Sequence, residues 1–164
     1  MSVCVQKLKN CAANWDNRDI CMDRFVKITV GIESVDWQAL RELLHRGFQQ
    51  ERSLETVQKV FLGSYLCCFA WHDGTLIGAV RAISDGFVSS AIYDVVVDPD
   101  FQGQGIGRKL METLLSRLPK RSVMLVSTHG NEEFYRKLGF RKLRTAYMLQ
   151  DNFQAWEAGG YFDD

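Results

Sequence analysis

The chain has 164 residues, enough for one domain with a hydrophobic core. It carries 20 basic and 20 acidic side chains, so no net charge directs it to nucleic acid or to an anionic membrane. No apolar run reaches the roughly 18 residues that span a bilayer, and the polar start of the chain lacks the apolar core of a secretion signal. We therefore expect a cytoplasmic protein that binds neither nucleic acid nor membranes.

The five cysteines predict neither a disulfide framework nor a metal site. Their odd number, without a secretion signal, argues against disulfides. Cys67 and Cys68 are adjacent in an apolar run, so in a strand they point to opposite faces and pack as small hydrophobic side chains. Cys4, Cys11 and Cys21 have no C-x-x-C spacing and no nearby histidine, which argues against zinc.

Polarity divides the chain into three parts. Residues 1–23 are polar and poorly periodic and are expected to form an N-terminal extension. The core is expected over residues 24–150, and residues 151–164 form a C-terminal tail. All three parts are expected to belong to a single domain, residues 1–164.

The first half of the chain indicates one strand, two helices and a hairpin. Phe25 to Ile32 is rich in β-branched residues and favours a strand. A helix over residues 35–46, capped by Ser34, fits apolar side chains at three- and four-residue steps. A second short helix should follow Ser53. Two apolar runs, separated by His-Asp-Gly at 72–74, then predict a hairpin, because glycine tolerates the positive φ of its turn.

The second half alternates strands with helices. Strands are expected at 91–97 and 122–127, joined by a helix over 105–118 that Pro119 ends. A short helix should follow, with Asn131 as its N-terminal cap and Gly139 as its C-terminal cap, and a final strand over 140–149. The order predicts an α/β (α+β) fold with a mixed, mostly antiparallel sheet and flanking helices.

The stretch from Val95 to Leu115 reads VVVDPDFQGQGIGRKLMETLL and carries the strongest functional signal. A strand that leads through glycines into a helix binds anions, because the first-turn N–H groups are unpaired and glycines let a ligand approach them. A Walker A loop is excluded, because Gly107 is followed by Arg108 and Lys109 rather than by Lys-Ser/Thr. The dinucleotide pattern G-x-G-x-x-G fails too, because its last position is Arg108 or Leu110.

The segment Gln102 to Gly107, QGQGIG, resembles the Gln/Arg-x-x-Gly-x-Gly/Ala signature of the GNAT superfamily of acetyl-CoA-dependent N-acetyltransferases. The preceding VVVDPDFQ resembles that superfamily's fourth strand, and EEFYRKLGF, Glu132 to Phe140, resembles its Phe-Tyr-x-x-x-Gly-Phe segment. Upstream, VDWQALRELL and LIGAVRAISDG resemble a bacterial-type subgroup of small members. The resemblance covers roughly residues 25 to 150 and implies the GNAT fold, in which the two central parallel strands splay apart.

The resemblance also implies how acetyl-CoA binds. The backbone of the glycine loop would hold the pyrophosphate, and the open edge of the fourth strand would pair with the pantetheine amides. Arg108 could add a charged contact to phosphate or remain a solvated side chain. The residues implied at the cofactor are Val95, Val96, Val97, Gln102, Gly103, Gln104, Gly105, Ile106, Gly107, Arg108, Phe134 and Tyr135. No metal is implied.

Acetyl transfer to an amine needs a base and a proton donor for the departing thiolate. Tyr135 matches the superfamily's proton donor, and packing on the cofactor is its alternative role. Asp94 is a candidate base, with a structural carboxylate bonded to a turn or to Arg81 as the alternative. Its neighbour Tyr93 should face the opposite side of the strand. His129 is a second candidate base, and a loop histidine is its alternative.

The acceptor is expected to be a primary amine of a small molecule, attacked directly in a ternary complex. Aromatic side chains on the expected acceptor side, namely Trp37, Phe48, Phe61, Tyr65 and Tyr147, suit an aromatic or apolar amine. The alternatives are a non-catalytic acyl-CoA sensor and an acetyltransferase acting on protein N-termini or lysines. The resemblance also allows a homodimer, through the final strand and the tail.

Overall fold

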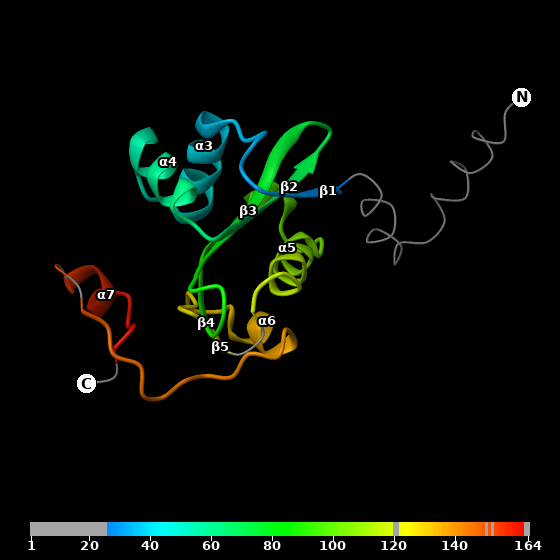
Figure 1. Ribbon diagram of the computed structural model, residues 1–164. Coiled ribbons are helices and arrows are strands. Elements are labelled where there is room, and N and C mark those ends of the chain that lie inside the picture. The colour runs from blue at the N-terminus through cyan, green and yellow to red at the C-terminus, as the bar shows by residue number, and fades with distance from the viewer. Residues whose placement is uncertain (1–25, 120–121, 150, 152, 163–164) are drawn as a thin grey trace, which may run out of the picture. The chain divides into compact units, whose positions relative to one another are not determined.

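The computed structural model describes residues 26–119, 122–149, 151 and 153–162 (Figure 1). The expected N-terminal extension, residues 1–23, lies outside these described residues. The chain forms two compact units that divide after Thr128.

The first unit is built on a five-stranded mixed sheet. Its strands are β1 Val26–Val30, β2 Leu66–His72, β3 Thr75–Ser84, β4 Ser89–Val97 and β5 Ser122–Leu125. Their order in the sheet follows the chain, β1-β2-β3-β4-β5. The first three pairings are antiparallel, whereas β4 and β5 are parallel. This confirms the predicted mixed, mostly antiparallel sheet.

The hairpin between β2 and β3 forms at the predicted His-Asp-Gly turn. Asp73 and Gly74 both adopt positive φ, 47° and 78°. Two consecutive left-handed residues match the right-handed twist of the flanking strands, which is why Asp-Gly marks such turns. The turn therefore fixes the pairing of Trp71 with Leu76 and of His72 with Thr75.

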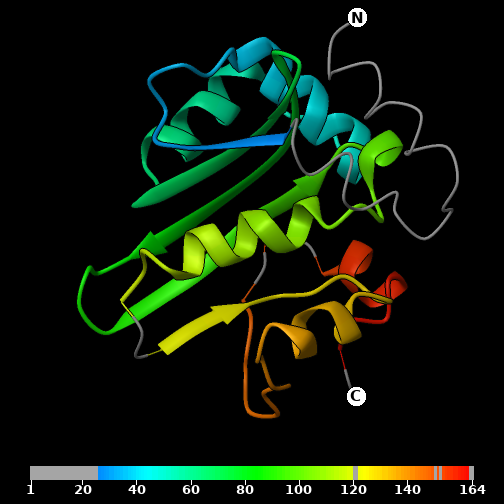
Figure 2. The same ribbon diagram turned by 90° about the vertical axis from the view of Figure 1, so that its right-hand side faces the viewer.

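Helices cover both faces of the sheet. Helices α3, Trp37–Phe48, and α4, Leu54–Leu62, lie on one face, and α5, Ile106–Leu115, lies on the other (Figures 1 and 2). Helix α4 follows Ser53 as predicted, and the Ser53 side chain caps it by accepting the N–H of Thr56. The predicted cap of α3 was wrong: Asp36 caps it rather than Ser34, because its carboxylate reaches the N–H groups of the first turn.

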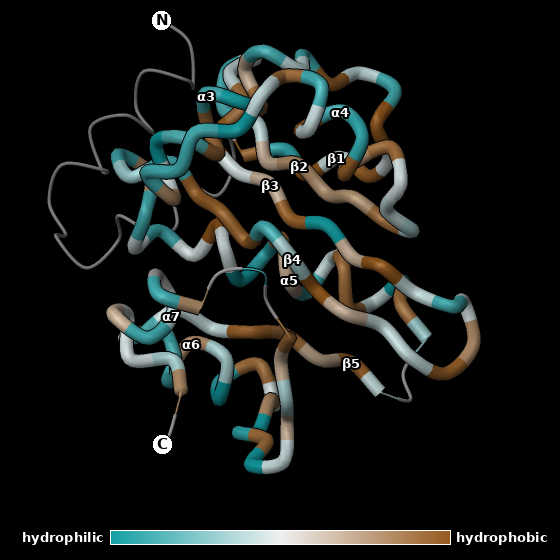
Figure 3. The backbone as a smooth tube through the Cα atoms, turned by 90° about the vertical axis from the view of Figure 1, so that its left-hand side faces the viewer, coloured by the Kyte–Doolittle hydropathy of each residue, from teal (hydrophilic) through white to brown (hydrophobic). Residues whose placement is uncertain are grey.

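The core lies on both sides of β2 and β3, and the strands carry hydrophobic stretches (Figure 3). On one face, Cys67 and Phe69 pack with the buried side chains of α3 and α4. On the other face α5 approaches closely, since a Cβ on Gly78 would lie 2.9 Å from Leu110 Cδ1. Cys67 and Cys68 are both buried, as predicted, and burial raises the pKa of each thiol to about 11.

Strand β5 is shorter than predicted and ends at Leu125 rather than at Ser127. The last pair in the β4–β5 register joins Ile92 to Leu125. Two residues further along β4, Asp94 has a φ of 50°, which interrupts the regular strand. Because a strand needs a regular neighbour for its backbone bonds, the parallel pairing stops there.

The second unit contains α6, Glu132–Lys137, and α7, Gln154–Ala158. Gly139, with a φ of 88°, follows α6 and supplies the predicted C-terminal cap. The predicted strand over 140–149 was wrong, because these residues form no regular element. The side chains of Tyr147 and Leu149 are 99% and 94% exposed, so neither is buried against a strand or helix among the described residues.

Candidate active site

Strand β4 pairs with β5 along only half of its length. The register runs from Ser89–Ser122 to Ile92–Leu125, and no described residue of β5 pairs with β4 beyond it. On the other edge, Asp98 N–H donates to Ile77 C=O at 2.8 Å. Because alternate residues direct their backbone groups to opposite sides, Val97 turns its N–H and C=O away from β3. Among the described residues of this unit, no strand pairs with the end of β4 on this edge, where the Val97 C=O accepts only a side-chain hydrogen bond from Gln102, and the two parallel strands splay as expected.

The Val96 side chain, at this end of β4, packs against α3. Val96 is buried, while Val95 and Val97 are partly buried. A Cβ on Gly47 would lie only 2.2 Å from Val96 Cγ2, so the last turn of α3 can approach β4 only because residue 47 is glycine. The predicted strand core and an open backbone edge therefore coexist in the same residues.

A 3-10 turn, η3, Pro99–Phe101, leads from β4 toward the glycine loop. The buried Asp98 accepts the N–H of Asp100 at 3.0 Å and pairs with Arg46 Nη1 at 2.8 Å. Gln102 Nε2 donates to Val97 C=O at 3.0 Å. These contacts fix the start of the loop on the end of β4.

The glycine loop then enters α5. Gly103 and Gly105 have φ of 74° and 78°, a conformation that L-residues rarely adopt. A Cβ at either position would meet no atom within 4 Å, so these glycines face open space. Gly105 is the N-cap of α5, and in the described part of the chain no side chain caps this helix. The first-turn N–H groups, at the positive end of the helix dipole, are therefore suited to an anion.

Two polar side chains flank these N–H groups. Gln104 Oε1 is buried and has no hydrogen-bond partner among the described residues. Arg108 Nε pairs with Glu112 Oε1 at 2.8 Å, and 61% of its side chain is exposed. An anion at the loop would therefore share Arg108 with Glu112, whereas the backbone N–H groups need no rearrangement.

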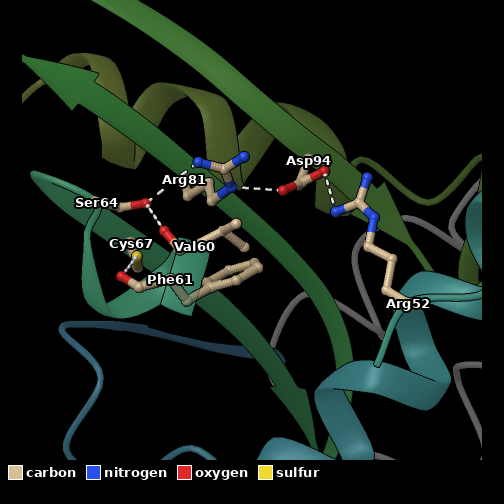
Figure 4. A network of polar contacts seen from close by, with 7 residues as sticks. All are labelled: Arg52, Val60, Phe61, Ser64, Cys67, Arg81 and Asp94. Carbon is tan, nitrogen blue, oxygen red and sulfur yellow. Dashed lines mark hydrogen bonds and ion pairs between the residues drawn. The ribbon is translucent and has the colours of Figure 1, made fainter. Parts of the chain in front are cut away.

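Asp94 lies at a bulge in β4, where the β3–β4 register shifts between Ala79 and Arg81. Its carboxylate bridges two arginines (Figure 4). Arg81 Nε donates to Oδ2, and Arg52 Nη1 donates to Oδ1 at 2.9 Å. The contact with Arg81 agrees with the alternative role expected for Asp94, that of a structural carboxylate bonded to Arg81. Arg52 was not predicted, because nothing in the sequence links residues 42 positions apart.

The expectation that Tyr93 and Asp94 face opposite sides was wrong. The Arg81 guanidinium lies 4.9 Å from the Tyr93 ring centroid, and it also donates to Asp94. The bulge adds a residue to one strand and interrupts the alternation of side chains, so both residues reach Arg81. The Phe61 ring of α4, 5.8 Å away, places this cluster on the sheet face that carries α3 and α4.

In the second unit, Tyr135 lies on α6 among aromatic rings. Its ring centroid is 5.0 Å from that of Phe134 and 6.0 Å from that of Phe140. Burial raises the pKa of the Tyr135 phenol, so the group stays protonated at neutral pH. His129 forms a 2.7 Å hydrogen bond between Nε2 and the C=O of Gly159, so this ring nitrogen is engaged within its own unit.

A family model for the acetyltransferase (GNAT) family matches residues 37–140. The chain belongs to this family. The matched range begins at α3 and ends after α6, so it contains the open edge of β4, the glycine loop and Tyr135.

Several known proteins resemble this GNAT chain. It is 44% identical over 68 residues to histone acetyltransferase TAP1 from Glycine max, covering 40% of this chain and 29% of that protein. It is 35% identical over 116 residues to the chloroplastic serotonin N-acetyltransferase 2 from Oryza sativa subsp. japonica, covering 65% and 56%. The chain thus spans less than two thirds of the length of either relative.

A solved structure of a GNAT-family acetyltransferase from Streptococcus pneumoniae shares the fold. Its TM-score is 0.64 at 24% identity, and the match covers 77% of this chain and 99% of that one. At this identity the likeness concerns the fold alone, and it agrees with the mixed sheet found here.

The aromatic residues expected near the acceptor differ in their surroundings within this GNAT chain. Phe61 is fully buried, and Trp37 and Phe48 pack against the same core. Tyr65 is 51% exposed, and Tyr147 in the second unit is 99% exposed. Within the described ranges, no group of His, Cys, Asp or Glu side chains is arranged to hold a metal, and no helix is long and apolar enough to cross a membrane.

Proposed function

We propose that this GNAT chain transfers the acetyl group of acetyl-CoA to a primary amine of a small molecule. The amine attacks the thioester directly in a ternary complex. The observation that carries this proposal is the open edge of β4 followed by two positive-φ glycines and an uncapped helix. That sequence of features offers amide partners and then an anion site, as the pantetheine arm and pyrophosphate of coenzyme A require.

The glycine loop is the proposed pyrophosphate site, and the open edge of β4 is the proposed pantetheine site. The fit rests on the open space around Gly103 and Gly105, which a Cβ would occupy. The residues proposed to contact the cofactor are Val95, Val96, Val97, Gln102, Gly103, Gln104, Gly105, Ile106, Gly107, Arg108, Phe134 and Tyr135. Acetyl-CoA itself supplies the activated acetyl group.

Tyr135 is the proposed proton donor to the departing thiolate. Its raised pKa supports this role, because the phenol keeps its proton over the whole neutral range. The predicted role of Asp94 as base requires one carboxylate oxygen to release an arginine, since both accept hydrogen bonds. Its contacts support the structural role more directly, in which case a water molecule takes the proton of the amine.

Binding and turnover test this function separately. Calorimetry on the full chain should detect acetyl-CoA but neither ATP nor NAD, and a panel of primary amines should then release free thiol from acetyl-CoA. Binding of ATP or NAD without acetyl-CoA would contradict the assignment of the loop. Binding of acetyl-CoA without turnover of any small or peptide amine would instead identify an acyl-CoA sensor.

The cytoplasmic location, the lack of nucleic-acid and membrane partners, and the homodimer stay predictions from the sequence. The rice relative is named as a chloroplastic protein. Fractionation of the native host and size-exclusion chromatography of the full chain test the location and the dimer.

A further inference from the structure

The cluster formed by Arg52, Arg81 and Asp94 carries more positive than negative charge. Two guanidinium groups share one carboxylate. The exposed fractions of the side chains are 7% for Asp94, 11% for Arg81 and 27% for Arg52. Charges this far from water are stable only when paired and hydrogen-bonded. The cluster therefore retains one positive charge that an anion can balance.

The two arginines differ in how many partners they have. Arg81 donates to Asp94 and, at 3.4 Å, to Ser64 Oγ, and it lies against two aromatic rings. Arg52 donates to Asp94 from Nη1, and its guanidinium carbon is 5.9 Å from the Phe48 ring centroid. Among the described residues its other N–H groups have no hydrogen-bond partner. A guanidinium with a free edge is the preferred partner of a carboxylate, which it can bind with two parallel bonds.

No neighbouring acidic side chain in the sequence neutralises Arg52. Glu51 precedes it but pairs with His45 Nδ1 at 3.4 Å, and the Glu51 side chain is 77% exposed. The partner Asp94 holds Arg52 in one place without cancelling the charge of the whole cluster. The guanidinium is thus fixed before a ligand arrives, which lowers the entropy lost on binding.

Arg52 also lies beside the segment proposed to hold the thioester. It belongs to the connection between α3 and α4, and its partner Asp94 immediately precedes Val95 at the open end of β4. The cluster lies on the sheet face that carries α3 and α4 (Figure 4), whereas α5 packs on the other face. An acceptor that approaches β4 from the α3–α4 side would meet the Arg52 guanidinium.

We propose that Arg52 binds a carboxylate of the acceptor, so that the acceptors of this protein are amines that carry an anionic group. The proposal rests on the proposed function and specifies its substrate class. Asp94 positions Arg52, while the rings of Phe48 and Tyr93, which lie against the two arginines, contact the apolar part of the acceptor. The earlier expectation of an apolar or aromatic amine is thereby narrowed to one with a carboxylate.

Matched pairs of acceptors test this directly. Tryptophan with tryptamine, phenylalanine with phenethylamine, and 4-aminobutyrate with propylamine differ only by a carboxylate. In the full chain, kcat/KM should favour at least one carboxylate-bearing member. Arg52→Gln should reduce that preference roughly tenfold to a hundredfold, as expected for a lost charge-assisted bond, and leave the KM for acetyl-CoA unchanged. Arg52→Lys should restore part of it.

Lys59→Gln is the matched control, because Lys59 is an exposed cation of α4 paired with Glu55. It should leave the preference unchanged. The proposal is overturned if the wild-type protein prefers every decarboxylated analogue, or if Arg52→Gln keeps the preference while remaining folded by circular dichroism. If no amine turns over, calorimetry with the same pairs on the CoA-loaded protein decides instead. Arg52-dependent binding of the carboxylate members would then support the site, although the transferase function had failed.

Discussion

Replacing Gly105 with alanine probes the proposed anion site, and Gly74 provides a control with the same backbone geometry. Both glycines have a φ of 78°, and a Cβ at either meets no atom within 4 Å. Alanine in this left-handed conformation costs roughly 1–2 kcal/mol, and the same amount at both sites. Because domains of this kind are stable by about 5–15 kcal/mol, both variants should remain folded.

The two substitutions should differ only in cofactor binding. At Gly105 the added methyl group occupies the space that we assign to the pyrophosphate, whereas Gly74 lies in the β2–β3 hairpin. Loss of one charge-assisted backbone bond is worth about 1.5–3 kcal/mol, or roughly a tenfold to hundredfold increase in the Kd for acetyl-CoA. Calorimetry with acetyl-CoA, together with urea unfolding of each variant, measures both effects. Equal Kd values for Gly105→Ala, Gly74→Ala and the parent chain would refute the assignment of this loop.

Three further predictions concern individual side chains. Tyr135→Phe should lower kcat by about a hundredfold or more. Burial raises the Tyr135 pKa, so the difference in free energy of unfolding between the variant and the parent should stay constant below about pH 10. At higher pH the parent should lose stability relative to the variant, as measured by urea unfolding, because its phenol ionises more readily in the unfolded chain. Asp94→Asn should lower the free energy of unfolding by about 3–5 kcal/mol, because it leaves two arginines without a counter-ion. The control Glu55→Gln, in an exposed ion pair of α4, should change the free energy of unfolding by less than about 0.5 kcal/mol. Equal losses in the two variants would contradict the claim that burial makes the Asp94 ion pairs important for stability. Cys67 and Cys68, with pKa values of about 11, should react with a thiol reagent at pH 8 only after unfolding, in a variant whose three cysteines before residue 25 are replaced by serine; rapid labelling of the folded chain would show that they are accessible.

Features set by neighbouring residues could be predicted from the sequence. The hairpin turn at Asp73 and Gly74 depends on local φ preferences, and the start of α4 after Ser53 likewise depends on neighbouring residues. The positive φ of Gly103 and Gly105 likewise follows from the glycine pattern before a helix. The fold class was predicted for the same reason, since the order of strands and helices is largely a sum of local signals.

Features that depend on distant contacts could not be predicted. The bulge at Asp94 changes which side chains share a face, and no residue-by-residue alternation reveals it. Arg52 reaches Asp94 from a loop 42 residues earlier, so its role appears only in three dimensions. Residues 140–149 have strand-like composition but no pairing partner among the described residues, and composition alone cannot provide one.

Transfer of a labelled acetyl group tests the central claim most directly. The full chain would be incubated with acetyl-CoA that carries carbon-13 in its acetyl group and with amines that include the carboxylate-bearing acceptors above. We predict that mass spectrometry will find the label on an amine nitrogen, with one free coenzyme A formed for each acetylated product. Binding of acetyl-CoA with no labelled amine above the enzyme-free rate, across small-molecule and peptide amines, would contradict the claim that this protein is an N-acetyltransferase.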